Sequence, residues 1–186
     1  MSRSQQLLLV LGLIGAAAAS RLVPHVNNFV PVGAMALFGA AALPKKWLAV
    51  VVPAAAFYLS DLVLNNTVYA AYYEGFHWGA SWWSLGAIVL MVIFGMGLLR
   101  HRAFSWLRVG GAAIGATAIF YLVTNFGVWV GGTMYPKTIT GLVACYAAGL
   151  PFVLNSLLAN LAFSSLLFGL GRYLELRELT VAPARS

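Results

Sequence analysis

Polar side chains that could bind a ligand lie together in the stretch SRLVPHVNNFVPVGAMALFG, residues 20–39, between two strongly apolar runs. The guanidinium of Arg21 donates hydrogen bonds, the ring of His25 donates or accepts them, and the amides of Asn27 and Asn28 do both. Hydrocarbon would not accept such a cluster, because a polar group without a hydrogen-bond partner is costly in an apolar medium. The cluster is therefore expected to face water, another part of the protein or a bound solute.

Asp61, in the apolar sequence YLSDLVL, is the only acid inside a predicted membrane span. A carboxylate at the centre of a membrane helix costs at least about 2.5 kcal/mol, so such residues usually face a bundle interior or a water-filled cavity and have partners. Two interpretations follow from this. Asp61 caps a neighbouring helix or pairs with Arg21 for structure, or it contacts a ligand or an ion.

Other polar and aromatic residues are expected at the same depth as Asp61, near the outer ends of their helices. The candidate substrate-binding residues are His25, Asn27, Asn28, Asp61, Thr124, Asn125, Trp129, Tyr135 and Asn155. Some have a simpler explanation, since Asn27 and Asn28 could cap the next helix and Asn125 could bond another helix. Trp and Tyr residues could anchor the membrane interface. The convergence of the set at one depth predicts an outward-opening polar pocket.

Catalytic or metal-binding chemistry has little support in the sequence. No Ser-His-Asp arrangement, phosphate-binding loop or dinucleotide-binding glycine motif is present, and no His, Cys and Glu set has metal-ligand spacing. The single cysteine, Cys145, excludes an intramolecular disulfide and is expected to be a small apolar filler. We therefore expect a protein that is not an enzyme and carries no cofactor and no metal.

The composition of the chain is that of an integral membrane protein. Of 186 residues, 62% are hydrophobic and only 8% are charged, and the mean hydropathy is +0.89. A soluble domain carries roughly a quarter charged residues, so the lipid bilayer is the expected surrounding. The net charge of +7 comes from basic residues in short loops. This pattern argues against a nucleic-acid partner and favours a role in membrane topology.

Six membrane-spanning helices are predicted, in a single all-α domain that covers residues 1–186. The spans are expected at about residues 5–20, 29–43, 47–64, 82–99, 109–130 and 152–172. The apolar run 138–171 is too long for one crossing, and Pro151 has no backbone N–H. We therefore divide that run into a short surface helix at about 138–149 and the sixth span.

The charges predict that both termini are cytoplasmic. With the N-terminus inside, nine basic residues fall in cytoplasmic segments, and only Arg21 and Lys137 fall outside. This imbalance follows the positive-inside rule. It places the polar residues 20–28 at the outer surface.

The first predicted helix carries small residues at a spacing of four. Gly12 is paired with Ala16 in this way, and Gly15 with Ala19. Such small faces let membrane helices approach one another closely. These four residues are therefore expected either to pack inside the bundle or to dock a partner membrane subunit.

Three segments closely resemble those of an uncharacterised family of bacterial integral membrane proteins: RLVPHVNNFVPVGAMALFGAA, YLSD and TNFGVWVGGTMYPKTITGLVACYAAGLPFVLNSLLANLAF. The shared motifs are PHxxNFxPVxAxALF, and TNFGVW followed by YPxTxxGLxxCY. The likeness runs from about Arg21 to Gly169. It implies a multi-pass protein of the bacterial inner (cytoplasmic) membrane, in a family whose function is unknown.

More distantly, the layout resembles the S-components of energy-coupling-factor vitamin transporters, which are six-helix membrane proteins with both termini inside. The resemblance implies an S-component-like bundle that binds a vitamin or cofactor-type solute, for instance of the corrinoid class, near the outer face. It also implies that the small residues of the first helix dock a transmembrane partner.

The alternative is a non-transporting scaffold or regulatory subunit of a membrane complex, whose polar residues bond the helices to one another. A cavity of about 300 Å³ or more would favour solute binding. Mutual bonds among Asp61, Asn125 and Asn155 would favour the scaffold.

Overall fold

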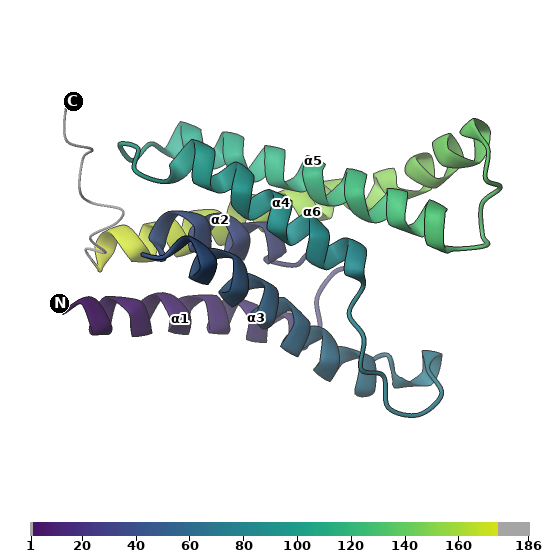
Figure 1. Ribbon diagram of the computed structural model, residues 1–186, viewed down its shortest axis with the longest axis horizontal. Helices are drawn as coiled ribbons and strands as arrows, with labels where there is room; N and C mark the ends of the chain where they lie inside the picture. Colours follow the sequence, from purple (N-terminus) through teal and green to yellow (C-terminus); the bar gives the residue numbers. More distant parts are fainter. Residues whose placement is uncertain (1, 175–186) are drawn as a thin grey trace.

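The protein is an all-helical bundle in the computed structural model, which describes residues 2–174. Those residues form six α-helices and two short 3-10 helices and no strand. The α-helices are α1 (Arg3–Ala19), α2 (Val32–Ala42), α3 (Lys46–Asn66), α4 (Trp82–Leu99), α5 (Trp106–Gly131) and α6 (Ile139–Tyr173), and the 3-10 helices are η1 (Ser20–Leu22) and η2 (Ala70–Tyr72). Successive α-helices run in opposite directions, so their connections gather at two ends of the bundle (Figure 1).

Hydroxyl side chains start four of these α-helices. Ser2 and Gln5 form a capping box at α1, in which Gln5 N–H donates to Ser2 Oγ at 3.2 Å and Ser2 N–H donates to Gln5 Oε1 at 2.8 Å. Ser81, Ser105 and Thr138 each accept a backbone N–H at the starts of α4, α5 and α6. Each cap satisfies a donor that the first helical turn leaves open.

Four α-helices coincide with predicted ranges. The ranges 5–20, 47–64, 82–99 and 109–130 match α1, α3, α4 and α5 to within three residues at either end. Five α-helices, namely these four and α6, are long and apolar enough to cross a membrane. The chain therefore fits a lipid bilayer environment.

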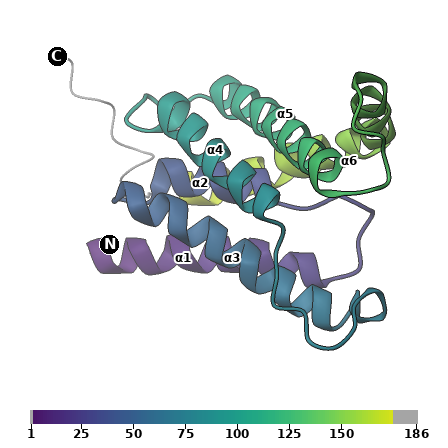
Figure 2. The ribbon, with the colours of Figure 1, turned by 45° about the vertical axis from the view of Figure 1, so that its right-hand side comes forward.

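The short helix α2 lies at the centre of the bundle. All of its residues, Val32–Ala42, are buried, and it contacts each of the other five α-helices. Glycine permits this packing: a Cβ on Gly39 would stand 2.7 Å from Pro53 Cγ of α3, and a Cβ on Gly95 of α4 would stand 3.0 Å from Leu37. The helix α2 lies between α1 and α3 on one side and α4 and α5 on the other (Figure 1 and Figure 2).

The predicted span 29–43 is wrong in extent. Helix α2 has only 11 residues and is about 16 Å long, about half of the roughly 30 Å hydrocarbon thickness. Residues 23–31, termed segment 23–31 below, are not helical. Backbone without helical bonds is stable at membrane depth only where protein buries it or where it lines a water-filled cavity. A functional site is therefore expected beside segment 23–31.

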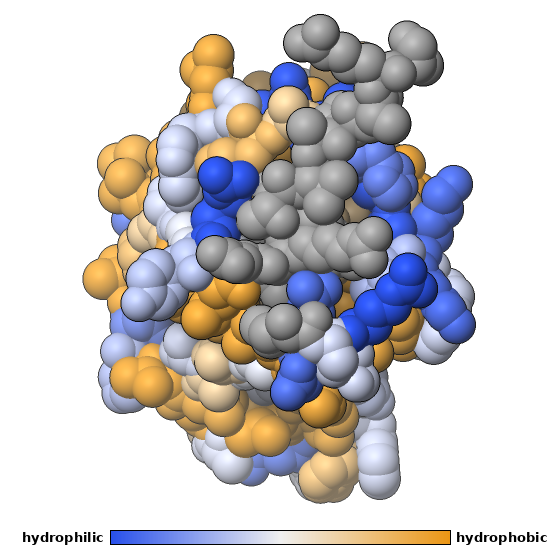
Figure 3. Space-filling model, turned by 90° about the vertical axis from the view of Figure 1, so that its left-hand side faces the viewer, coloured by the Kyte–Doolittle hydropathy of each residue, from blue (hydrophilic) through white to orange (hydrophobic). Residues whose placement is uncertain are grey.

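Charge distinguishes the two ends of the bundle. The basic end carries the start of α1, the end of α6 and the connections 43–45 and 100–105, and the loop end carries the connections 20–31, 67–81 and 132–138. Within residues 2–174 the basic end has no acid, and its basic residues are Arg3, Lys45, Lys46, Arg100, Arg102, Arg108 and Arg172. Hydrophilic residues gather on this end (Figure 3).

The first and last described residues lie together at the basic end (Figure 1). Arg177 and Arg185, two of the nine basic residues predicted to be cytoplasmic, lie outside the described residues.

Helix α6 is one 35-residue helix that contains Pro151, so the predicted division into a helix at 138–149 and another at 152–172 is wrong. The first part of α6 is set at an angle to the rest (Figure 2). Proline removes one backbone donor and crowds the carbonyl four residues earlier, which kinks a helix whose other bonds persist. Packing against α5 supports the bent part, since buried Cys145 Sγ donates to the Asn125 carbonyl at 3.3 Å. A Cβ on Gly149 would stand 2.6 Å from Asn125 Oδ1.

The four small residues that form the predicted stripe on α1 do not pack inside the bundle. The exposed face of α1 includes Gly12, Gly15, Ala16 and Ala19. A Cβ on Gly12 or Gly15 would meet no atom within 4 Å. The buried residues of α1 are instead Val10, Ile14, Ala17 and Ala18. The interpretation of this stripe as internal packing is therefore wrong.

Candidate functional site

Two neighbouring cavities lie at the loop end, between segment 23–31 and the helices α3, α5 and α6. The larger has a volume of about 610 Å³ and the smaller of about 200 Å³. Both are lined by Asn28, Phe120 and Phe152, so they adjoin. The charged and polar residues of the larger cavity include Arg21, His25, Asn27, Asn28 and Asp61.

An ion pair forms one wall of the larger cavity. Arg21 Nη2 donates to Asp61 Oδ1 at 2.5 Å, and the Arg21 side chain is 7% exposed while that of Asp61 is 19% exposed. Arg21 also donates to the Phe57 carbonyl at 3.1 Å and to the Ser60 hydroxyl, and its guanidinium lies 4.4 Å from the centroid of the Phe57 ring. Residues three and four apart share a helix face, so one face of α3 receives the arginine.

This ion pair still has hydrogen-bonding capacity. Within residues 2–174, the second carboxylate oxygen of Asp61 accepts no hydrogen bond, and the buried Nε of Arg21 has no acceptor. Asp61 therefore pairs with Arg21, as one interpretation of the sequence expected, and it also presents an acceptor to the cavity that it lines.

Segment 23–31 is held in place by α6. Asn155 Nδ2 donates to the Asn27 carbonyl at 3.0 Å, and Ser156 Oγ donates to the Asn28 carbonyl at 3.2 Å. Asn28 has a φ of 61°, in the left-handed region that asparagine adopts more readily than most residues. Because these bonds use main-chain carbonyls, they leave the amide side chains of Asn27 and Asn28, which line the larger cavity, for a solute.

Among residues 2–174, His25 has a single hydrogen bond, and that bond is local. Its Nδ1 lies 2.6 Å from the Val23 carbonyl oxygen. A carbonyl can only accept, so Nδ1 carries the proton, and Nε2 is an acceptor in the neutral ring. His25 thus adds a second acceptor, besides Asp61, to the larger cavity.

The start of α2 adjoins the inner part of the larger cavity, which Val32 lines. A buried network fixes this helix end: Asn160 Oδ1 accepts the Ala34 N–H at 3.2 Å, and Asn160 Nδ2 donates to Thr117 Oγ1 at 2.9 Å. Gly33 makes room for it, because a Cβ there would stand 2.6 Å from Asn160 Nδ2. A helix N-terminus carries partial positive charge, so this part of the cavity favours electronegative groups of a solute.

Thr124 and Asn125 line the smaller cavity, together with Tyr121 of the same helix. Thr124 Oγ1 donates to the Phe120 carbonyl at 2.7 Å, and Asn125 Nδ2 donates to the Tyr121 carbonyl at 2.9 Å. The interpretation of Asn125 as a side-chain bond between helices is therefore wrong, since its side chain bonds to its own helix α5.

Three predicted positions differ in the structure. Trp129 and Tyr135 line neither cavity. Trp129 lies one turn, about 6 Å, past Asn125 on α5, and Tyr135 lies in the connection that follows the end of α5 at Gly131. Trp129 Nε1 instead donates to the Pro136 carbonyl at 2.9 Å. Asn155 positions segment 23–31 without lining either cavity.

The expected helix cap by Asn27 or Asn28 is also wrong. The N-cap residue of α2 is Pro31, and no side chain caps this helix.

Two further parts of the site lay outside the predicted set. Arg21, the cation of the larger cavity, belongs to the polar cluster 20–39 and is an expected partner of Asp61, but it is not among the candidate substrate-binding residues; a lone arginine between apolar runs was the signal for it. Thr117 and Tyr121 precede Asn125 at a spacing of four on α5 and line the smaller cavity with it. That spacing places them on one helix face, so the sequence alone could have indicated that Thr117 and Tyr121 share a surface with Asn125.

The two cavities offer groups that can bind a solute. Acceptors on His25 and Asp61, amides on segment 23–31 and a positive helix end lie between apolar walls that include Phe57, Phe120 and Phe152. Among residues 2–174, no three His, Cys, Asp or Glu side chains lie close enough together to hold a metal ion. The arrangement can hold and orient a solute.

Long apolar helices around a buried half-length helix, with a polar cavity at one end, define the chain as a multi-helix membrane protein. It belongs to the Family of unknown function (DUF6580), which it matches over residues 1–182. This membership confirms the resemblance to an uncharacterised family. No curated protein and no solved structure matches the chain.

Proposed function

We propose that this protein is a membrane transport protein that binds a small solute of vitamin or cofactor type in the larger loop-end cavity. The observation that carries the proposal is the cavity itself, with its volume of about 610 Å³ and the Arg21–Asp61 pair in its wall. Ligand sites usually measure about 300–1,000 Å³ and combine apolar walls with a few fixed polar groups. The larger cavity has both properties.

The bonding of the polar residues supports solute binding over helix-to-helix bonding. Asp61 bonds to Arg21, Asn125 bonds within α5, and Asn155 bonds to segment 23–31. A scaffold held by these residues would instead bond them to one another. The polar groups surround a space, which is the arrangement that a ligand requires.

In this proposal the bundle is S-component-like, both termini are cytoplasmic, and the loop end faces the outside of a bacterial inner membrane. The seven basic residues and the absence of acids at the described part of the basic end support this orientation. The larger cavity then receives a solute from outside. Its volume suits a vitamin or a cofactor precursor, and a solute of the corrinoid class would need the two cavities to join.

A second candidate function is that of a scaffold or regulatory subunit in a membrane complex. The exposed stripe Gly12, Gly15, Ala16 and Ala19 favours it, because small residues let a partner helix approach closely. The same stripe would dock a partner subunit of a transporter. Solute binding is therefore the property that separates the two functions.

Native mass spectrometry of the purified full-length protein tests for the solute. We expect a small molecule to be retained and identified by its mass. His25→Ala should reduce its retention about tenfold, which corresponds to one lost hydrogen bond, and should keep the wild-type melting temperature. The matched control is His77→Ala, a histidine of the loop end that lines neither cavity. A wild type that retains no solute, or equal retention by His25→Ala and His77→Ala, would contradict the proposal.

A further inference from the structure

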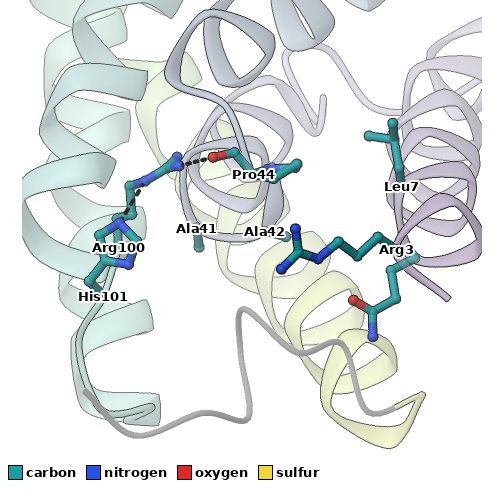
Figure 4. A pocket seen from close by; sticks show the side chains of 8 residues that line it. Arg3, Leu7, Ala41, Ala42, Pro44, Arg100 and His101 are labelled. Carbon is teal, nitrogen blue, oxygen red and sulfur yellow. Dashed lines mark hydrogen bonds between the residues drawn. The ribbon is translucent and has the colours of Figure 1, made fainter. Parts of the chain in front are cut away.

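A third cavity lies at the basic end, at the opposite end of the bundle from the candidate site. It has a volume of about 340 Å³ and is lined by Arg3, Gln6, Leu7, Ala41, Ala42, Pro44, Arg100 and His101. The start of α1, the end of α2 and the end of α4 meet around it (Figure 4). The proposed transport function makes no use of this cavity.

Arg100 is fixed in the wall of this cavity by the C-terminal end of α2. Its Nη1 donates to the Ala40 carbonyl at 3.3 Å, its Nη2 to the Pro44 carbonyl at 2.6 Å and its Nε to His101 Nε2 at 3.2 Å. The last carbonyls of a helix lack helical partners and carry partial negative charge, so Arg100 stabilises the end of α2. A guanidinium has five N–H groups, and two of them remain for a ligand.

Arg3 brings a second guanidinium to the same cavity from α1. Figure 4 shows its side chain extending toward the cavity, across from Arg100. The Arg3 side chain makes no hydrogen bond or ion pair with residues 2–174. Two cations that face a shared space repel each other, and an anion between them adds an attraction to each of them that offsets this repulsion.

No acid in the described chain offsets this charge. Asp61 and Glu74 are the only acids among residues 2–174, and both lie toward the loop end. Lys45, Lys46 and Arg102 add further positive charge near the cavity end of the bundle. A group of cations without acids raises the local concentration of anions.

Part of the cavity wall is apolar. Leu7 of α1, Ala41 and Ala42 of α2, and Pro44 form this part, beside the polar Gln6 and His101. A free inorganic ion gains nothing from apolar contacts, whereas an amphiphile places its charged group beside the arginines and its hydrocarbon along such a wall. The apolar flank of a membrane helix bundle is also where acyl chains lie.

We propose that this cavity binds the phosphate group of an anionic phospholipid, held between Arg3 and Arg100, with the acyl chains along the apolar wall. Arginine pairs with phosphate through parallel N–H donors. Basic pockets between membrane helices bind acidic headgroups in this way. The lipid is a component of the membrane and is not the transported solute.

A lipid competition with the full-length protein tests this site. The protein is mixed with equimolar phosphatidylglycerol and phosphatidylcholine, and the bound lipids are counted by native mass spectrometry. We expect phosphatidylglycerol to be preferred, and Arg3→Gln to reduce its retention about fivefold. The matched control is Arg102→Gln, which removes an exposed arginine of the same end that does not line this cavity. It should retain the wild-type preference.

Equal losses in Arg3→Gln and Arg102→Gln would trace the preference to the general charge of the basic end and overturn the proposal. Equal retention of the two lipids by the wild type would overturn it as well. A further arm adds inorganic phosphate without lipid and records the melting temperature. Stabilisation by phosphate that requires Arg3, without stabilisation by phosphatidylglycerol, would assign the cavity to a soluble anion. Every outcome is independent of whether the loop-end cavity binds a solute.

Discussion

Arg21 and Asp61 lie next to each other in surroundings that would expel either charge alone. Removing one partner of a buried pair is strongly destabilising, because it leaves the other charge uncompensated. Arg21 is the more buried of the two, while Asp61 remains 19% exposed and lines the larger cavity. Loss of the carboxylate therefore leaves the larger penalty behind, on an arginine that cannot be deprotonated.

We expect Asp61→Asn to lower the free energy of unfolding by about 1–3 kcal/mol. Arg21 keeps its bonds to the Phe57 carbonyl and the Ser60 hydroxyl but loses its counter-charge. Thermal unfolding in detergent measures the effect, and Glu74→Gln, an exposed acid that lines neither cavity, is the matched control. Solute binding is measured on the same variant. Unchanged stability together with unchanged binding would contradict both roles of Asp61.

At the scale of the helix, α2 shows how a membrane protein accommodates a helix that is too short to span the bilayer. Its 11 residues are all buried. The backbone groups at its two ends that have no partner within the helix therefore meet protein groups rather than lipid. Asn160 bonds the Ala34 N–H at one end, and Arg100 bonds the carbonyls of Ala40 and Pro44 at the other. Both cavities that we assign to ligands border an end of this helix.

Gly33→Ala tests the packing at the start of α2. The added Cβ would stand within 3 Å of three atoms of the Asn160 side chain, so that side chain must move and weaken its bond to Ala34 N–H. We expect the free energy of unfolding to fall by about 1–3 kcal/mol. Gly12→Ala is the matched control, because a Cβ there meets nothing within 4 Å and alanine favours the helix by up to about 1 kcal/mol. Equal melting temperatures for Gly33→Ala and the wild type would refute the tight packing.

At the scale of the whole molecule, the antiparallel helices divide the charges and the cavities between two ends. The described basic end has seven cations and no acid, and the loop end has the ion pair and both adjoining cavities. Short basic loops stay on the cytoplasmic side during insertion. The fold thus links the direction in which the larger cavity opens to the orientation of the chain in the membrane.

Reporter fusions test that orientation. We expect a reporter that is active only outside the cytoplasm to be active in the connection 67–81 and inactive at the C-terminus. A fluorescent protein that matures only in the cytoplasm should give the opposite result at the same two positions. Cytoplasmic exposure of residues 67–81 would contradict the orientation and place the larger cavity on the wrong side for uptake.

Local properties of the sequence were enough to predict much of this protein. Hydropathy is summed over neighbouring residues, so it located α1, α3, α4 and α5 to within three residues. Asp61 was predicted to lie in the bundle interior with Arg21 among its partners, because the cost of a carboxylate in hydrocarbon depends little on the details of the fold. Six of the nine candidate binding residues line one of the two loop-end cavities.

Only the tertiary structure decided the rest, because those features depend on what lies across from a residue. Residues 29–31 are as apolar as α2, and the helix starts at Val32 where Asn160 and Gly33 fit together. Pro151 bends α6 rather than ending it, because α5 packs closely against α6 at Gly149, two residues before the proline. Trp129 resembles a site residue in sequence, but it lies one turn past Asn125 on α5 and lines neither cavity. Distances between segments remote in the chain are set by packing, and no local pattern contains them.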